Sequence, residues 1–118
     1  MIQVNTNFTP YRMKIGRREP VNFTVELVNP DDEPKILTLN IALSKQLSFE
    51  KGGYKTEIIE RIKELPANGK KVFYYSIFPK AGTRTQEQPL MIHVAEHYRD
   101  FNYVKKEYKK NLGLKVED

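Results

Sequence analysis

Apolar and polar residues alternate with a period of two along much of this chain. Within residues 21–28 every second side chain is apolar, namely Val21, Phe23, Val25 and Leu27. Because successive side chains of a β-strand point to opposite faces, this alternation predicts a strand with one buried side. Residues 36–43 repeat the pattern, and their leucine side is expected to face the core. Further strands are predicted in residues 2–8, 12–15 and 104–116, while residues 44–49 either continue the strand before them or form an edge.

Residues 70–99 are expected to form the central hairpin of the domain. Their first half is dense in aromatic and branched residues, which suit a half-buried strand surface. In their second half Leu90, Ile92 and Val94 share one face of a strand with a period of two. A Pro-Lys-Ala-Gly-Thr sequence at residues 79–83 supplies the turn between the two strands. The remaining strands are then expected to assemble around this hairpin.

Residues 54–65 are the segment in which the pattern supports two structures. Ile58, Ile62 and Leu65 lie at helical spacing with charged residues between them, which indicates a helix. A strand instead places Ile58 and Ile62 on one face. The strands predicted before and after this segment favour the strand, because tertiary context overrides local propensity. We therefore predict a strand here and keep the helix as the alternative.

The predicted strands and turns together define the fold class. Seven to eight short strands follow one another at roughly regular spacing, with turn residues between them, as in an all-β sandwich. A length of 118 residues suits one domain with its own core. The sequence therefore predicts a single domain over residues 1–118, an Ig-like Greek-key β-sandwich of antiparallel strands.

The composition is that of a folded protein without disulfide bonds. Hydrophobic residues make up 39% of the chain and charged residues 30%, which is apolar enough to form a core. Cysteine is absent, which excludes disulfide bonds and thiolate metal sites. No apolar run reaches the roughly 18 residues of a membrane span, so no membrane insertion is expected. The first residues lack the features of a signal peptide, so a cytoplasmic location is expected unless the chain is a domain cut from a larger secreted protein.

The net charge of +5 comes from 20 basic and 15 acidic residues. The basic residues are interspersed with acidic ones and form no single tract, which is typical of a solvated surface. A nucleic-acid partner is therefore an alternative that the charge pattern does not favour. In this alternative the chain is a nucleic-acid or carbohydrate binding module that uses basic and aromatic surface residues. The basic residues concerned are Arg12, Lys14, Arg17, Arg18 and the lysines of residues 105–110.

Three segments resemble a known family of small domains. The Val-x-Phe-x-Val-x-Leu strand of residues 21–27, followed by Asn-Pro, resembles the opening strand of small Ig-like prokaryotic domains. Residues 62–69 are similar to the leucine-proline-glycine signature before a strand, and residues 79–94 resemble the closing hairpin. Over residues 20–98 the chain thus resembles the CARDB-type, or cell-adhesion-related, β-sandwich of bacteria and archaea. It departs from the family in an Ala-Asn insertion between the proline and the glycine, and residues 99–118 carry no family signature. The resemblance implies a binding or spacer module without catalytic residues.

One motif suggests a metal site. His93, Glu96 and His97 match H-x-x-E-H, the pattern of inverted zinc peptidases. That chemistry needs a helix, because residues four apart on a helix share a face and both imidazoles then reach one Zn²⁺. On a strand the two histidines lie about 13 Å apart. The alternation over residues 90–94 favours the strand, so no metal is expected and a zinc peptidase is the most remote alternative.

No other combination of residues indicates catalysis. No Ser-His-Asp order in the chain indicates a catalytic triad, and the chain has no glycine-rich phosphate loop and no carboxylate pair that differs from ordinary surface acids. It is therefore not expected to be an enzyme, and no cofactor is expected. Two Asn-Phe-Thr sequences, at residues 7–9 and 22–24, match the acceptor pattern for N-glycosylation and are attributed to chance.

Aromatic residues give the remaining functional signal. Residues 73–78 place aromatic side chains on both faces of one predicted strand, and a core needs only one of these faces. The predicted function is a non-catalytic Ig-like interaction or structural module that binds another protein, or itself, through a sheet face. The predicted contact surface combines an aromatic residue with a histidine. The candidate binding residues are Phe73, Tyr75, His93 and His97.

Overall fold

The computed structural model describes residues 1–17, 19–80 and 86–117. In this part of the chain the structure consists of nine β-strands and one short 3₁₀ helix. No helix among the described residues has the length and apolar character needed to span a membrane. The elements are β1 (Gln3–Thr9), β2 (Arg12–Lys14), η1 (Ile15–Arg17), β3 (Val21–Val28), β4 (Lys35–Leu43), β5 (Leu47–Ser48), β6 (Glu57–Leu65), β7 (Lys70–Pro79), β8 (Glu87–His97) and β9 (Val104–Glu117).

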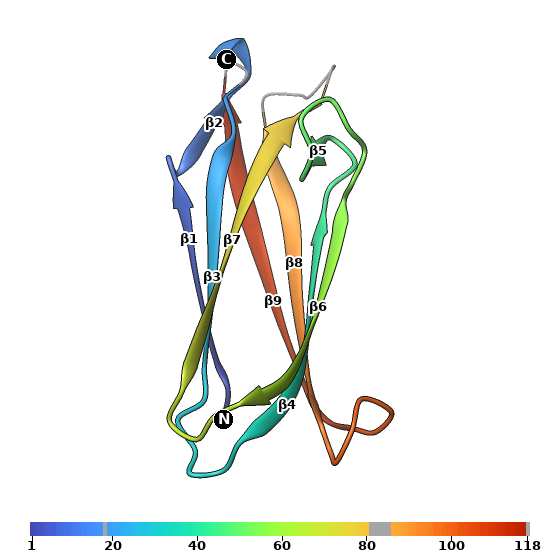
Figure 1. Cartoon of the computed structure of the whole chain (residues 1–118). Helices are drawn as coiled ribbons and strands as arrows, with labels where there is room; N and C mark the ends of the chain where they lie inside the picture. The colour runs from blue at the N-terminus through green and yellow to red at the C-terminus, as the bar shows by residue number, and fades with distance from the viewer. Residues whose placement is uncertain (18, 81–85, 118) are drawn as a thin grey trace.

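The strands form two sheets that pack face to face as an elongated sandwich (Figure 1). Sheet A has the strand order β1-β3-β7-β5, and sheet B has the order β2-β9-β8-β4-β6. Neighbouring strands are antiparallel except β2 and β9, which are parallel. The molecule measures 47 × 24 × 19 Å. The predicted Ig-like β-sandwich is therefore confirmed, with β2 and β5 as short additional strands.

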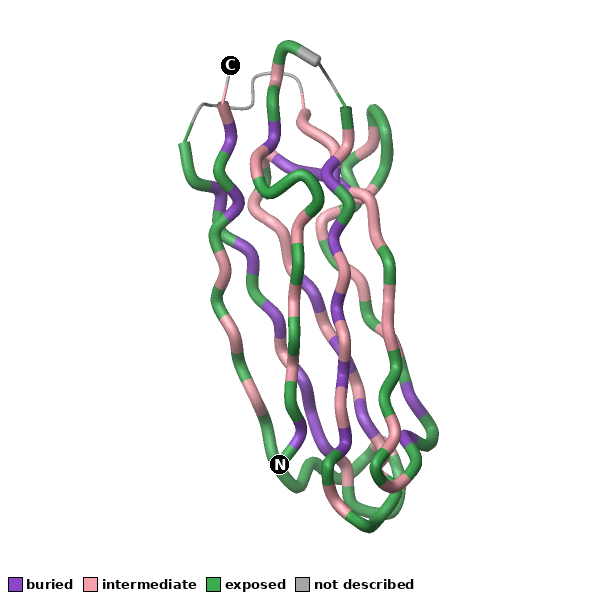
Figure 2. The backbone as a smooth tube through the Cα atoms, turned by 90° about the vertical axis from the view of Figure 1, so that its left-hand side faces the viewer, coloured by how far each residue is buried: buried purple, intermediate pink, exposed green. Residues whose placement is uncertain are grey.

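The core lies between the sheets and follows the alternation of the sequence (Figure 2). Val21, Phe23, Val25 and Leu27 of β3 are buried, and on β4 the leucine side faces the core as predicted. Phe23 is completely buried and stacks on Phe8 of β1, with ring centroids 4.9 Å apart. Full burial of one such side chain is worth about 1.5–3 kcal/mol, so the two apolar faces provide much of the stability of a chain without cysteines.

The predicted central hairpin is wrong. β7 pairs with β3 and β5 in sheet A, whereas β8 pairs with β4 and β9 in sheet B. The chain therefore passes from one sheet to the other between these strands, and residues 81–85 of the expected turn lie outside the described residues. The physical reason is that alternation reports only which side of a strand is buried. Two strands that face each other across a core alternate just as two hydrogen-bonded neighbours do.

The strand predicted for the ambiguous segment is confirmed, and its helical spacing has a structural cause. In the ladder between β4 and β6, Leu37 is opposite Ile62 and Lys35 is opposite Leu65. Between these two pairs one residue of β4, Ile36, is opposite two residues of β6, Lys63 and Glu64, which is a β-bulge. The extra residue turns Leu65 to the same side as Ile62, and both side chains are buried. The bulge therefore produces a spacing of three between apolar residues within a strand.

The last strand is an edge strand over most of its length. β2 covers β9 only at residues Lys115 to Glu117, so residues 104–114 have a strand neighbour on one side only. The lysines at residues 105, 106 and 109 are exposed on this edge. Such lysines discourage edge-to-edge association of sheets.

Candidate functional site

The two histidines lie on the outer face of sheet B. On β8 the side chains of Ile92 and Val94 point into the core, so the alternate positions point outward. A hydrogen bond of 2.7 Å joins His97 Nε2 and Thr38 Oγ1. His93 Nε2 lies 3.5 Å from Glu107 Oε1. Both imidazoles therefore belong to one solvent-facing surface and are oriented by neighbouring side chains.

The two aromatic candidates lie on the inner side of sheet A. Phe73 is opposite Val25 and Tyr75 is opposite Phe23, and both partners are buried. The Tyr75 hydroxyl donates a hydrogen bond to Glu60 Oε1 at 3.3 Å. Burial raises the pKa of Tyr75, and the negative charge of Glu60 raises it further. Tyr75 is thus held neutral at the margin of the core.

The structure therefore does not bring the four predicted binding residues together. His93 and His97 share one surface, but Phe73 and Tyr75 belong to the other sheet and face inward. Neither Phe73 nor Tyr75 shares a surface with His93 or His97, because that arrangement relied on a hairpin that does not form. Tyr74, between the two aromatic candidates, is the exposed ring of this strand.

The zinc-peptidase alternative does not fit the structure. Its motif lies on strand β8, where His93 and His97 are about 13 Å apart along the strand. Glu96 points to the opposite side and is buried. In residues 1–17, 19–80 and 86–117 no group of three or more His, Asp or Glu side chains is placed to hold a metal ion. The helical geometry that the motif requires is replaced by a strand.

The centre of the outer face of sheet B is uncharged and partly apolar. Ile59, Asn40 and His93 lie in one row across β6, β4 and β8, and Met91 lies beside Ala42 in the next row. Ile59 is 55% exposed and Met91 is 38% exposed. We call this surface the sheet B face. It comprises Thr38, Asn40, Ala42, Ile59, Met91, His93 and Ala95.

A buried acceptor without a partner lies in the middle of the sheet B face. The Oδ1 atom of Asn40 has almost no solvent contact, and no described residue donates a hydrogen bond to it. A buried acceptor that lacks its hydrogen bond costs about 1–3 kcal/mol. Charged side chains flank the centre on both sides, from Glu57 and Arg61 on β6 and from Glu107 and Lys109 on β9. An uncharged centre with a polar rim is typical of a protein–protein interface.

The basic residues of the nucleic-acid alternative do not converge. Arg12 pairs with Lys115 at the C-terminal end of β9, and its guanidinium binds Glu117 at 2.7 Å. Lys105 lies ten residues earlier on the same strand, about 33 Å away. Arg18 and the side chain of Arg17 lie outside the described part of the chain. The described basic residues are therefore spread along the length of β9 and are not gathered on one surface.

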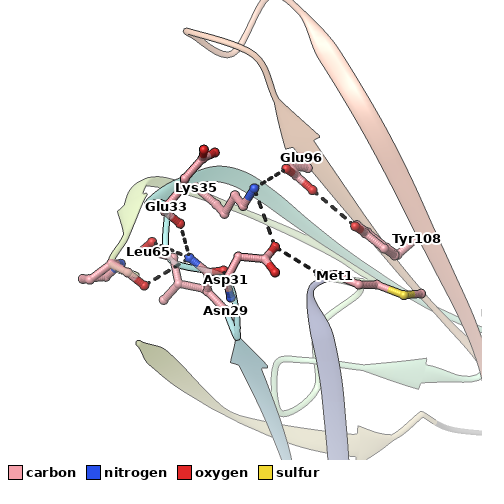
Figure 3. Close-up of polar contacts among 9 residues, drawn as sticks. Met1, Asn29, Asp31, Glu33, Lys35, Leu65, Glu96 and Tyr108 are labelled. Atoms are coloured by element: carbon pink, nitrogen blue, oxygen red, sulfur yellow. Dashed lines mark hydrogen bonds and ion pairs between the residues drawn. The ribbon is translucent and has the colours of Figure 1, made fainter. Parts of the chain in front are cut away.

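A buried ion pair joins the neighbouring strands β4 and β8 of sheet B near the chain's first residue (Figure 3). Lys35 Nζ lies 3.1 Å from Glu96 Oε1 and 3.7 Å from Asp31 Oδ2. The Tyr108 hydroxyl donates to the other Glu96 oxygen at 3.2 Å, and the amino group of Met1 binds Asp31 at 3.0 Å. The hydrogen bond to Glu96 raises the pKa of Lys35, and burial raises the pKa of Tyr108.

This network was not predicted from the sequence, although a signal for it existed. Lys35 is an even number of residues from the buried leucines of β4, so its side chain points to the same side as theirs. Glu96 is likewise on the same side of β8 as the buried Ile92. Opposite charges at two core-facing positions indicate a buried pair. Because β4 and β8 are neighbours, their register brings the two charges together. The pair fixes the packing of the strands and offers no open site for a substrate.

Asn29 connects the turns at the same end of the sandwich (Figure 3). The side chain is fully buried, and its Nδ2 donates to the carbonyl oxygens of Glu33, Leu65 and Pro66 at 2.7, 3.2 and 3.1 Å. Its Oδ1 accepts a hydrogen bond from the backbone N–H of Asp31. Asn29 thus organises two connections between the sheets, from β3 to β4 and from β6 to β7.

Comparison with known proteins identifies the fold. The chain matches no known family and no curated protein in sequence. Among solved structures 176 chains match, so the architecture is common and does not specify one activity. The crystal structure of the major pilin subunit of Bacillus cereus matches with a TM-score of 0.69 and 9% sequence identity. The match covers 99% of this chain and 40% of the pilin, so the chain spans less than half of that protein's length. The similarity supports an Ig-like β-sandwich and does not single out the CARDB-type family, whose membership stays a prediction.

Proposed function

We propose that the chain is a non-catalytic interaction module that binds protein through the sheet B face. The observation that carries this proposal is the uncharged, partly apolar centre of this face inside a rim of charged side chains. Ile59 and Met91 expose apolar side chains there, and contact with protein excludes water from them.

The fold comparison supports a structural or adhesive role. The pilin that shares the fold is a subunit, that is, a component of a larger assembly. The CARDB-type domains that the sequence resembles are binding or spacer modules. A second copy of this chain is therefore one candidate occupant of the sheet B face, and another protein of the same assembly is the other. His93 lies on this surface, and its binding role stays a prediction.

Substitution of the exposed apolar residues tests this proposal. The double variant Ile59→Lys/Met91→Lys is expected to weaken association at least tenfold, because each lysine must be desolvated in the interface. The matched control is Tyr54→Lys, which also replaces an exposed hydrophobic side chain but lies in the loop before β6. Sedimentation velocity over a range of concentrations measures self-association. Capture with the tagged chain, followed by mass spectrometry, compares the partners of wild type, double variant and control.

The result has a clear meaning in either direction. A complex formed by wild type and by Tyr54→Lys but lost in the folded double variant supports the sheet B face. Equal association by all three chains, with circular dichroism showing intact β structure, contradicts it. A monomer that retains no protein specifically also contradicts it.

A further inference from the structure

The outer face of sheet A carries a repeated tripeptide. Residues 7–9 and 22–24 are both Asn-Phe-Thr, and they pair antiparallel in adjacent strands β1 and β3. Phe8 and Phe23 of the two copies are opposite one another and stack on the inner side. The flanking residues must then project outward, because side chains alternate along each strand. Four polar side chains thus lie together on the outer surface: Asn7, Thr9, Asn22 and Thr24.

An exposed aromatic ring completes this surface. Tyr74 of β7 lies opposite Thr24, and its side chain is 77% exposed. Ser76 lies opposite Asn22 in the adjacent row. A shallow hollow of about 270 Å³ has formed here, lined by Asn22, Phe23, Thr24, Tyr74, Tyr75 and Ser76. We call the outward residues Asn7, Thr9, Asn22, Thr24, Tyr74 and Ser76 the sheet A face.

Most polar groups of the sheet A face are available to a ligand, although Asn7 Nδ2 donates a hydrogen bond to Thr9 Oγ1 at 3.3 Å. Among the described residues, none makes a hydrogen bond with the side chains of Asn22, Thr24, Tyr74 or Ser76. The face has no charged side chain, although 30% of the residues in the chain are charged. The adjacent carboxylate, Glu26, accepts a hydrogen bond from Asn5 at 3.1 Å.

We propose that the sheet A face binds a neutral oligosaccharide. Amide and hydroxyl side chains both donate and accept hydrogen bonds, as sugar hydroxyls do. The face of an aromatic ring is negative, so it attracts the positively polarised C–H groups on the apolar side of a pyranose. The face is two rows deep and three strands wide, roughly 7 by 10 Å. This is the size of a disaccharide unit lying across the strands.

The absence of charge selects this ligand over others. A nucleic acid needs basic side chains against its phosphates, and the sheet A face has none. Charged peptides and anionic membrane surfaces likewise find no opposite charge here. A neutral sugar is the ligand whose donors, acceptors and apolar faces match an uncharged polar surface with one exposed ring. This inference concerns the opposite sheet from the proposed protein-binding face and does not depend on it.

Native affinity electrophoresis tests the inference. The purified chain is run in gels that contain hydroxyethylcellulose, xyloglucan, galactomannan or dextran, with heparin and polygalacturonate as anionic comparisons. At least one neutral polysaccharide is expected to retard the wild type. Tyr74→Ala and Asn22→Ala are expected to lower the affinity at least tenfold. The matched control Tyr103→Ala removes another exposed tyrosine, which lies in the turn before β9, and is expected to bind as wild type does.

Three electrophoresis results would overturn the inference. The first is that none of the four neutral polysaccharides retards the chain, the second is that only the anionic ones retard it, and the third is that Tyr74→Ala is retarded as strongly as wild type. Because both substituted side chains are exposed, the variants are expected to fold, which circular dichroism checks. Amide chemical shifts measured with an oligosaccharide of the retarding polymer locate the site. Changes in β1, β3 and β7 support the sheet A face, whereas changes in β4 and β8 assign the sugar to the sheet B face and contradict the inference.

Discussion

Lys35 and Glu96 are the residues whose positions depart most from what a β-sandwich core requires. Both charges are nearly buried, with 12% and 4% of their side chains exposed. Removing charges from water is costly, and only close pairing with further hydrogen bonds offsets the cost. The Tyr108 hydroxyl supplies such a bond to the carboxylate. The pair is thus stable as a unit, and loss of one member leaves an uncompensated charge.

Lys35→Met is therefore expected to lower the free energy of unfolding by roughly 3 kcal/mol at neutral pH. The raised pKa of Lys35 also predicts how this difference depends on pH. The contribution of a group with a raised pKa is complete below its unfolded pKa, about 10.4 for lysine, and disappears as the pH rises through the folded value. The difference between wild type and variant should narrow above about pH 10.4. Urea denaturation curves of both proteins, monitored by circular dichroism at several pH values, measure this difference in the free energy of unfolding.

Lys63→Met is the matched control for this prediction. It removes an exposed lysine from β6 and should change the stability by no more than about 0.5 kcal/mol. The double variant Lys35→Met/Glu96→Leu should recover part of the loss, because it leaves no buried charge. If Lys35→Met were as stable as the control at neutral pH, or if the difference stayed constant into the alkaline range, the account of the buried pair would be wrong.

At the scale of elements, β9 shows how the fold handles an open edge. Its partner β2 is short and covers only residues 115–117. On that side, the backbone groups of residues 104–114 therefore have no neighbouring strand. Lysines occupy much of this stretch, and their repulsion opposes pairing with the same edge of another molecule. The apolar residues on its inner side, from Tyr108 to Val116, still attach the strand to the core.

Removal of the edge lysines is expected to cause association. The variant Lys105→Thr/Lys106→Thr/Lys109→Thr keeps residues that suit a strand but removes the charge from the edge. Light scattering should show concentration-dependent oligomers that wild type does not form at the same concentration. The control Lys45→Thr/Lys51→Thr/Lys55→Thr removes equal charge from loop positions and should scatter as wild type does. Equal behaviour of the two variants would mean that net charge, and not edge protection, governs association.

At the scale of the whole molecule, three strands have neighbours on both sides along their length. β3 lies between β1 and β7, β4 lies between β6 and β8, and β8 lies between β4 and β9. β7 has only the two-residue strand β5 on its second side. Strands with neighbours on both sides are expected to be the most protected from hydrogen exchange. Their amides exchange only when a larger part of the domain opens.

Native-state hydrogen exchange is expected to be slowest in β3, β4 and β8. The amides of β1 and of residues 104–114 should exchange faster, since these segments lie at the edges. Nuclear magnetic resonance resolves the rates residue by residue. If β7 and β8 exchanged together as the most protected unit while β4 exchanged quickly, the molecule would be organised around a hairpin and the two-sheet topology would be incorrect.

Much of the fold could be predicted because alternation is a local property. Val21, Phe23, Val25 and Leu27 identify the buried side of β3 without any knowledge of its neighbours. The same reasoning found β4, β8 and β9, and the β context correctly favoured a strand for β6. The candidate site was predicted only in part. His93 and His97 were assigned to an outer face, whereas Phe73 and Tyr75 face the core. The cytoplasmic location stays a prediction.

The sequence by itself thus determined which residues form strands and which side of each strand is buried. The tertiary structure alone decided which strands are neighbours. Hydrogen-bonded pairing and packing across a core impose the same period of two, so the alternation of β7 and β8 could not show that they belong to different sheets. The same limit applies to the surfaces. Asn40, Ile59 and His93 on one side, and Asn22, Thr24 and Tyr74 on the other, become neighbours only through strand order and register.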